Sequence, residues 1–267
     1  MSLSHAADVT FNGTQVNVAA GGTSTYDVGT VTASTTLNFA GAGTATITNL
    51  NGDAPEAVLT VNRVANGGVN LSTLNLNGPG TFNGVISLFS NTTAGTQNNF
   101  LNLNHALAAQ YATIRLGGHG YATGASVLKA GVNTSISKLE HNNTAALITG
   151  EGTTLTITGD SSSYGGSFGG TVTVDYTGGG TFTLGNSDKT VALTPAASAD
   201  ATLKISSGTL SLFSGNVNWS QKLVMGDGTT LTVQDGPAVT GYYNYDAASI
   251  NGDGFTFSGT TTFGTGV

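Results

Sequence analysis

The chain has 267 residues, of which 40 are glycine, none is cysteine and only 8% are charged. The absence of cysteine excludes a disulfide framework and thiolate metal sites. The net charge is −7, and the seven lysine and arginine residues are scattered singly, so no basic stripe exists for nucleic acid. A hydrophobic content of 38% with so few charges is the opposite of a disordered composition, and we expect a folded chain. No apolar run approaches the roughly 20 residues that span a bilayer, so this fragment is not expected to contact a membrane.

The first part of the chain, to about residue 95, has the pattern of short strands joined by Asn-Gly turns. Asn and Gly tolerate positive φ, which tight corners between strands require. Within the strands, β-branched and aliphatic residues alternate with small polar ones, so one face of each strand is buried and the other is wet. Along the whole chain the clearest strands cover 44–48, 71–76, 154–158, 171–174, 181–184, 202–205, 209–212 and 230–233.

The middle of the chain departs from this pattern. Three of the four histidines lie between about residues 96 and 151, and the segment 104–111 has the composition of one or two helical turns. We therefore predict an irregular insertion around 96–151. The repeat is cleanest from 152 to 233, and residues 234–267 are predicted to form a capping region. An all-β chain of this length is commonly one unit, so the prediction is a single solenoid domain over 1–267.

Two all-β architectures fit the alternation: a parallel β-helix, which is a solenoid, and an antiparallel β-sandwich. A sandwich needs charged or bulged edge strands to prevent edge pairing, whereas a solenoid pairs every internal edge with the next coil. The very low charge favours the β-helix. Coils of roughly 20 to 25 residues, stacked about 4.8 Å apart, predict about a dozen coils and a rod of roughly 55 to 60 Å.

One segment, 152–184, resembles the autotransporter-associated β-strand repeat. It begins Gly-Thr-Thr-Leu-Thr-Ile-Thr-Gly and continues through a Ser-Tyr-Gly turn into Gly-Thr-Val-Thr-Val. The positions that match the family pattern are Leu155, Ile157, Gly159, Tyr164, Gly165, Val172 and Val174. Residues 209–212 resemble another copy of the strand. Two features depart from the family: Gly169-Gly170 lengthens the turn, and Gly180-Thr-Phe-Thr-Leu184 stands where the family has a second Gly-Thr-Leu.

The resemblance implies a right-handed β-helical passenger of a Gram-negative autotransporter. Such passengers reach the cell surface through a C-terminal outer-membrane barrel, which would anchor the full-length protein and lies outside this sequence. They are mostly adhesins, self-associating factors of aggregates and biofilms, or stalks that display another domain. The segment Ser4-His5-Ala6-Ala7-Asp8 has the small-x-small pattern that ends a cleaved signal peptide, which agrees with an extracellular location.

Possible catalytic motifs are weak. Gly165-Gly-Ser167-Phe-Gly169 fits the G-x-S-x-G string of a nucleophile elbow, but a strand is predicted after it where the elbow needs a helix. Asp160 and Asp175 fall where neighbouring coils bring acids together, as a polysaccharide-cleaving β-helix requires. The basic residues Arg63 and Arg115, which a lyase would also need, are distant in the sequence. We predict no enzyme activity, with polysaccharide cleavage as the alternative.

Metal and cofactor sites are not predicted. His5, His105, His119 and His141 lack ligand spacing to one another, and we interpret them as loop residues. Asp227 and Asp253 each lie between two glycines, but neither continues into a calcium-binding pattern, so both are interpreted as turn residues.

Four aromatic residues are the candidate contact surface. Trp219, Tyr242, Tyr243 and Tyr245 could stack on a sugar ring, although a cap over the last coil explains the same residues. Outward-facing Asn and Thr stacks give a second route, because two flat polar faces can associate through many weak contacts. The alternative is that these ladders only stabilise the rod internally.

The function expected from the sequence is an extracellular passenger fragment that acts as an adhesin or a self-association surface. Its partners would be a host surface or matrix ligand, or a second copy of the chain. The alternatives are a β-helical polysaccharide-degrading enzyme and a passive stalk or surface-layer element.

Overall fold

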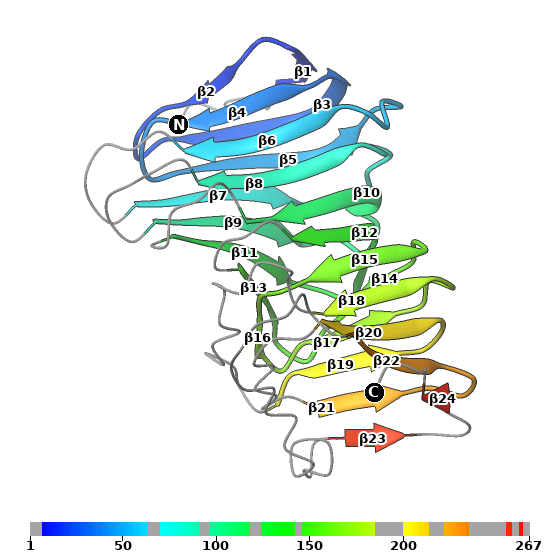
Figure 1. Cartoon of the computed structure of the whole chain (residues 1–267). Helices are drawn as coiled ribbons and strands as arrows, with labels where there is room; N and C mark the ends of the chain where they lie inside the picture. Colours follow the sequence, from blue (N-terminus) through cyan, green and yellow to red (C-terminus); the bar gives the residue numbers. More distant parts are fainter. Residues whose placement is uncertain are drawn as a thin grey trace.

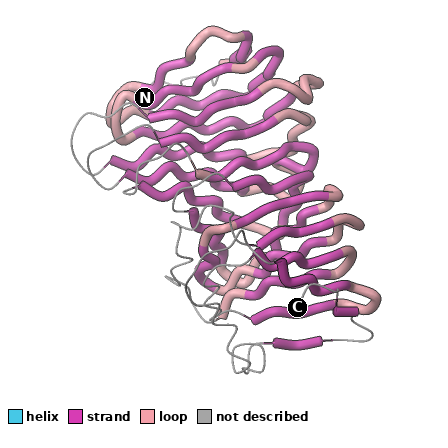
Figure 2. Tube along the Cα trace, in the orientation of Figure 1, coloured by secondary structure: helices cyan, strands magenta, loops and turns pink. Residues whose placement is uncertain are grey.

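The computed structural model describes residues 7–63, 70–90, 97–117, 124–141, 146–184, 200–213, 222–234, 255–257 and 262–263. Within these residues the chain consists of strands and turns, and every strand pairing is parallel (Figures 1 and 2). The described part of the chain has no helix that is long and apolar enough to cross a membrane. The architecture is that of a parallel β-solenoid.

The strands form three sheets. Sheet A contains, in spatial order, β1 (Val9–Asn12), β3 (Thr23–Ala33), β5 (Gly43–Asn51), β7 (Asn70–Leu76), β9 (Gln97–Leu103), β11 (Gly124–Ala130), β13 (Ala146–Gly150) and β16 (Ser167–Gly170). Sheet B contains β2 (Val16–Val18), β4 (Thr35–Phe39), β6 (Val58–Arg63), β8 (Val85–Ser90), β10 (Ala109–Leu116), β12 (Thr134–His141), β14 (Thr154–Ile157), β17 (Thr173–Tyr176), β19 (Thr202–Ile205), β21 (Lys222–Met225) and β23 (Phe255–Phe257). Sheet C contains β15 (Ser161–Tyr164), β18 (Thr181–Leu184), β20 (Thr209–Phe213), β22 (Thr230–Gln234) and β24 (Thr262–Phe263).

Successive coils stack in sequence order from the N-terminal end to the C-terminal end (Figure 1). The eleven strands of sheet B make ten steps, which corresponds to a rod of about 48 Å at about 4.8 Å a step. The offset between paired residues varies from 19, between Thr154 and Thr173, to 32, between Leu223 and Phe255. The predicted coil of 20 to 25 residues was therefore too uniform, because the corners differ in length while the strands keep their register.

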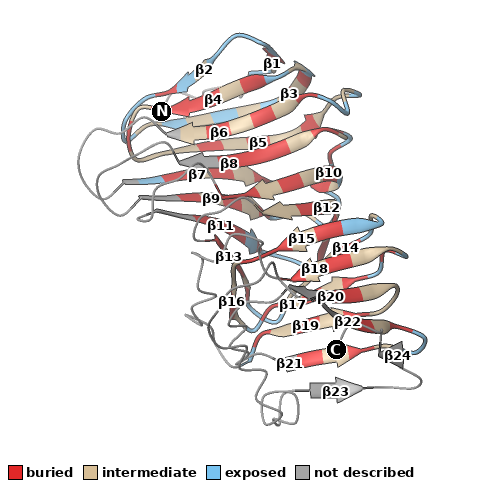
Figure 3. Cartoon of the chain, viewed as in Figure 1, coloured by how far each residue is buried: buried red, intermediate tan, exposed pale blue. Residues whose placement is uncertain are grey.

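The core is a set of apolar columns, each with one side chain per coil. Buried and partly exposed residues alternate along strands such as β17, β18 and β19, and the colour bands of Figure 3 show this alternation. On the inner face of sheet B, one column runs through Leu155, Val174, Leu203 and Leu223, and the next through Ile157, Tyr176, Ile205 and Met225. Because parallel register places like residues above one another, each apolar side chain packs on the equivalent residue of the neighbouring coils.

One sheet becomes two at β12. Residues 134–136 of this strand pair with β14 and continue sheet B. In the next coil the chain turns at 158–160, so the stretch that follows begins a new sheet with β15. The coils before β15 therefore have their described strands in sheets A and B. From β15 onwards the solenoid has a third face, which is sheet C (Figure 1).

The structure corrects two predictions. The antiparallel sandwich is wrong, because the described strands pair in parallel ladders. The irregular insertion around 96–151 is not found: its described residues supply β9 to β13, which extend sheets A and B in order. Of the features that suggested it, His105 lies in the turn between β9 and β10, and His141 is the last residue of β12. Residues 105–108 form a turn and no helix, and 109–111 begin β10. Of the predicted capping region, the structure describes Gln234, β23 and β24.

The corner before sheet C allows a test of the close stacking of coils. The carbonyl oxygens of Asp160, Gly180 and Gly208 each accept a hydrogen bond from the backbone N–H of the first strand residue in the next coil of sheet C. The N–O distances are 2.8 to 3.0 Å. Gly208 has a φ of +79°, and a Cβ on it would overlap the carbonyl oxygen of Gly180. Gly228, at the next corner, has a similar φ of +71° but open space around it.

We expect Gly208→Ala to lower the free energy of unfolding by about 2–4 kcal/mol, because strain and overlap add. Gly228→Ala, which introduces only the strain, should lower it by about 1 kcal/mol. Urea denaturation of the two variants checks the difference, and equal losses would show that the corner tolerates a side chain.

Candidate contact surface and groove

The four aromatic residues predicted as a contact surface, Trp219, Tyr242, Tyr243 and Tyr245, lie outside the described residues. The same holds for His5, His119 and Asp253, while Asp227 lies in the turn before β22, as expected. The prediction for the aromatic cluster therefore remains a prediction.

The G-x-S-x-G string does not form a nucleophile elbow. Ser167 is the first residue of β16, and the next element is the strand β17. The carbonyl oxygen of Ser167 accepts a hydrogen bond from the Tyr164 hydroxyl at 2.7 Å. An elbow needs a sharp turn from a strand into a helix, so the serine lacks the geometry that would expose its hydroxyl as a nucleophile.

The two described histidines occupy different surroundings. Nδ1 of His105 accepts a hydrogen bond from the Leu107 N–H at 3.1 Å, which stabilises a turn. His141 ends β12, and its ring meets the edge of the Tyr164 ring at a centroid distance of 5.6 Å. Within the described ranges no three His, Asp or Glu residues gather as metal ligands.

The two aspartates singled out for polysaccharide cleavage lie in different settings. Asp175 is on the outer face of β17, where its carboxylate accepts hydrogen bonds from Lys204 Nζ at 3.0 Å and Ser206 Oγ at 2.7 Å. Asp160 is exposed in the turn before β15, and its backbone carbonyl accepts a bond from the Tyr176 hydroxyl at 2.8 Å. Arg115 pairs with Glu140, a residue that the sequence did not single out.

Asparagine ladders run along the outer faces of the first coils. In sheet B, Asn38 donates to Asn17 at 3.3 Å and accepts from Asn62 at 3.1 Å. In sheet A, Asn102 donates to Asn75 at 2.8 Å, and beside it Asn104 donates to Asn77 at 2.9 Å. These amides hydrogen-bond one another from coil to coil, so they stabilise the rod internally, which is the second of the two roles considered for polar stacks.

The outer face of sheet C carries hydroxyl groups in two columns, which we call the hydroxyl face. Its members are Ser161, Ser163, Thr181, Thr183, Thr209, Ser211, Thr230 and Thr232, one pair for each of β15, β18, β20 and β22. Ser211 is buried. For the other seven, no side-chain hydrogen bond to another described residue is found. Their hydroxyl groups, unlike the asparagine amides, are left for water or a partner.

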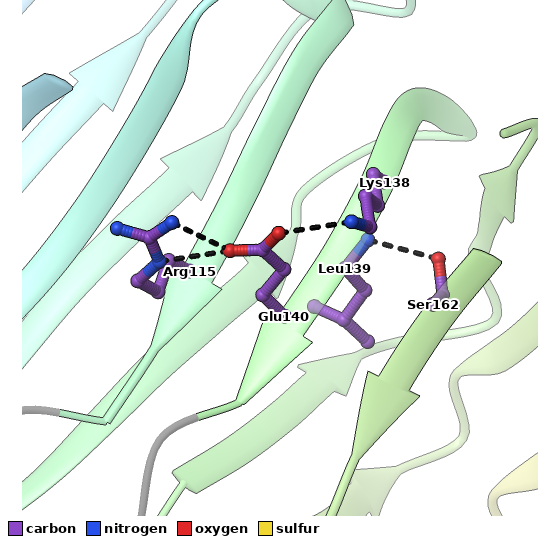
Figure 4. Close-up of polar contacts among 5 residues, drawn as sticks. All are labelled: Arg115, Lys138, Leu139, Glu140 and Ser162. Atoms are coloured by element: carbon purple, nitrogen blue, oxygen red, sulfur yellow. Dashed lines mark hydrogen bonds and ion pairs between the residues drawn. The ribbon is translucent and has the colours of Figure 1, made fainter. Parts of the chain in front are cut away.

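A groove lies where β15 follows β12, and we call it the junction groove. Its volume is about 330 Å³, and it is lined by Lys138, Glu140, His141, Ser161, Ser162, Ser163, Thr181 and Thr183. The groove exists because β15 does not continue the ladder of sheet B. In place of strand pairing, the N–H of Leu139 donates to the side-chain oxygen of Ser162 at 3.1 Å (Figure 4). The acceptor for the Leu139 N–H is therefore the buried hydroxyl oxygen of Ser162 and not a backbone carbonyl oxygen of a paired strand.

Two cations converge on one carboxylate at this groove (Figure 4). Arg115 contacts Oε2 of Glu140 through Nη2 at 2.7 Å and Nε at 2.8 Å, and Lys138 Nζ lies 3.0 Å from Oε1. Arg115 and Glu140 are opposite one another in the register of β10 and β12. Burial raises the pKa of the Glu140 carboxyl, but the hydrogen bonds and charges of Lys138 and Arg115 outweigh burial and hold the pKa below 4.5.

No family model matches this chain, and neither a curated protein nor a solved structure matches it. The resemblance to the autotransporter-associated repeat therefore stays a prediction.

The sheet B ladder predicts a graded effect of asparagine replacement. Asn38 is 7% exposed and lies in the middle of the ladder, whereas Asn17 is exposed at its end. Asn38→Ala leaves the Asn62 amide without its acceptor and should lower the free energy of unfolding by about 1–2 kcal/mol. Asn17→Ala should lower it by less, because water reaches the partner groups. Chemical denaturation measures both, and a larger loss for Asn17→Ala would contradict the ladder.

Glu140 predicts a dependence of stability on pH. Its pKa is lowered in the folded state, so its stabilisation is complete above the ordinary pKa of 4.5 and is lost as the pH falls through the lowered value. Glu140→Gln should therefore lower the melting temperature at pH 7, through a loss of up to about 1 kcal/mol.

The difference between wild type and Glu140→Gln should shrink as the medium is acidified. Glu56→Gln, at an exposed turn residue, serves as the matched control and should leave the melting temperature unchanged. A difference between wild type and Glu140→Gln that is constant down to the most acidic condition would contradict the role of the ion pairs.

Proposed function

We propose that this chain is a passenger segment of an extracellular, autotransporter-type surface protein, folded as a right-handed β-helix, and that it acts as an adhesin or self-association surface. The observation that carries the proposal is the hydroxyl face. Its outward groups repeat in register through β15, β18, β20 and β22, and seven of the eight lack a side-chain partner among the described residues.

The charge distribution supports this assignment. The hydroxyl face contains no ionisable side chain, whereas the outer face of sheet B carries the Lys204–Asp175 ion pair. Two copies of an uncharged face can approach without like-charge repulsion, and in-register hydroxyl groups present the same spacing to a second copy or to another repetitive ligand. A surface of weak, repeated contacts is suited to adhesion between cells or to a matrix.

Like charges on the hydroxyl face should weaken self-association. Thr209 and Thr230 are neighbours in the register of β20 and β22, and neither lines the junction groove. The double variant Thr209→Lys, Thr230→Lys should weaken self-association, measured by sedimentation over a range of concentrations, by more than about tenfold, because apposed like charges cost several kcal/mol. Bacteria that display this variant should clump less than those that display the wild type.

The matched control is Thr154→Lys, Thr173→Lys, which places the same two charges on register neighbours of sheet B. This control should associate as the wild type does. If the wild type stays monomeric, and cells that display it neither clump nor bind matrix, the chain is a passive stalk and the proposal is wrong.

A further inference from the structure

The junction groove lies beside a cluster of charged residues with a positive net charge. Lys138 and Arg115 supply two positive charges and Glu140 one negative charge, so the cluster carries a net charge of about +1 in a chain whose net charge is −7. Asp160, the nearest acid in sequence to β15, is exposed and does not line the groove. An anionic group is therefore favoured at this place.

Glu140 does not use all of the hydrogen-bond donors of Lys138. Lys138 has three N–H groups, directs its amine to one oxygen of Glu140 and keeps 37% of its side chain exposed. It lines the groove, whereas Arg115 lies behind Glu140 and holds the carboxylate in place through two hydrogen bonds. The Lys138 ammonium is thus available to a carboxylate that enters the groove, and Arg115 is a positioning residue.

The groove opens onto the start of the hydroxyl face. Ser161 and Ser163 of β15, and Thr181 and Thr183 of β18, belong both to the groove and to the face. Beyond them the hydroxyl columns continue through β20 and β22. Strands in a sheet are about 4.8 Å apart, which is close to the rise of one sugar in an extended polysaccharide. Each coil can therefore present hydroxyl groups to one sugar: a pair on β15, β18 and β22, and Thr209 alone on β20, where Ser211 is buried.

We infer that the junction groove binds a uronic acid unit of an acidic polysaccharide, with the polymer extending from the groove along the hydroxyl face. The Lys138 ammonium binds the uronate carboxylate, and the serine and threonine hydroxyls bind the sugar hydroxyls. A charged group at one end fixes the register of the polymer, and the uncharged columns supply the repeated contacts. This inference rests on the proposed function, for which it names the ligand class.

Isothermal titration calorimetry with oligogalacturonate tests the inference. The wild type should bind this probe, and Lys138→Gln should weaken binding by about tenfold or more, as expected for a lost hydrogen bond between charged groups. The same oligosaccharide with methyl-esterified carboxyls should bind at least about tenfold more weakly than the free acid. Thr183→Val, which removes one hydroxyl and keeps the shape, should weaken binding by a smaller factor.

The matched control is Lys204→Gln, which removes the same charge from an outer-face ion pair of sheet B and should leave binding unchanged. Circular dichroism melting verifies that the variants are folded. No binding by the wild type, equal binding by wild type and Lys138→Gln, or equal binding of the esterified probe would overturn the inference.

Free galacturonate distinguishes a polymer site from a simple anion site. It should bind much more weakly than the oligomer, and equal affinity would overturn the extension along the hydroxyl face. The outcome is separate from that of the self-association test, because self-association is measured by sedimentation of the protein without oligosaccharide, whereas oligogalacturonate binding is measured by calorimetry. Association without oligogalacturonate binding refutes only this inference, and monomeric protein that binds the oligomer refutes only self-association.

Discussion

Parallel, in-register stacking of coils is the constraint on which the rest of the structure depends. Each backbone N–H and C=O in a central strand bonds to the coil on either side, so a residue is fixed directly over its equivalents. Apolar residues then form core columns such as that of Leu155, Val174 and Leu203, and polar residues form outer columns. The same register produces both the asparagine ladders and the hydroxyl face, but only the amides have a length and chemistry that let them bond to one another along the stack.

The site arises where this constraint is relaxed. At the junction of β12 and β15 the backbone ladder is replaced by a hydrogen bond to the Ser162 side chain. The gap that results leaves room for the side chains of Lys138 and Glu140 beside the first hydroxyl pair. The solenoid therefore gains a third sheet and a charged groove from one change of direction, and the regular columns beyond the groove are the extended part of the same surface.

Alternation of small polar and apolar residues was sufficient to predict the solenoid and eight of its strands; for example, the expected segments 154–158, 181–184 and 202–205 overlap β14, β18 and β19. The start of a new sheet at β15 could not be predicted from the sequence, because it depends on which coil lies opposite the turn at 158–160. The Arg115–Glu140 pair was missed for a similar reason. Lys138 and Glu140 have the spacing of one strand face, but Arg115 meets them only when the coil offset is 25 residues, from 115 to 140. The offset varies from coil to coil, so no single repeat length gives it.

The unequal lengths of the corners also affect how the sequence of such a rod can change in evolution. Corners tolerate a coil offset of 19 in one place and 32 in another, while the strands on either side stay aligned. The number of residues between two strands can therefore change while the strands above and below remain paired. A lineage of such proteins can thus gain residues one corner at a time, or lengthen the rod by duplicating a layer, without refitting the hydrophobic interior.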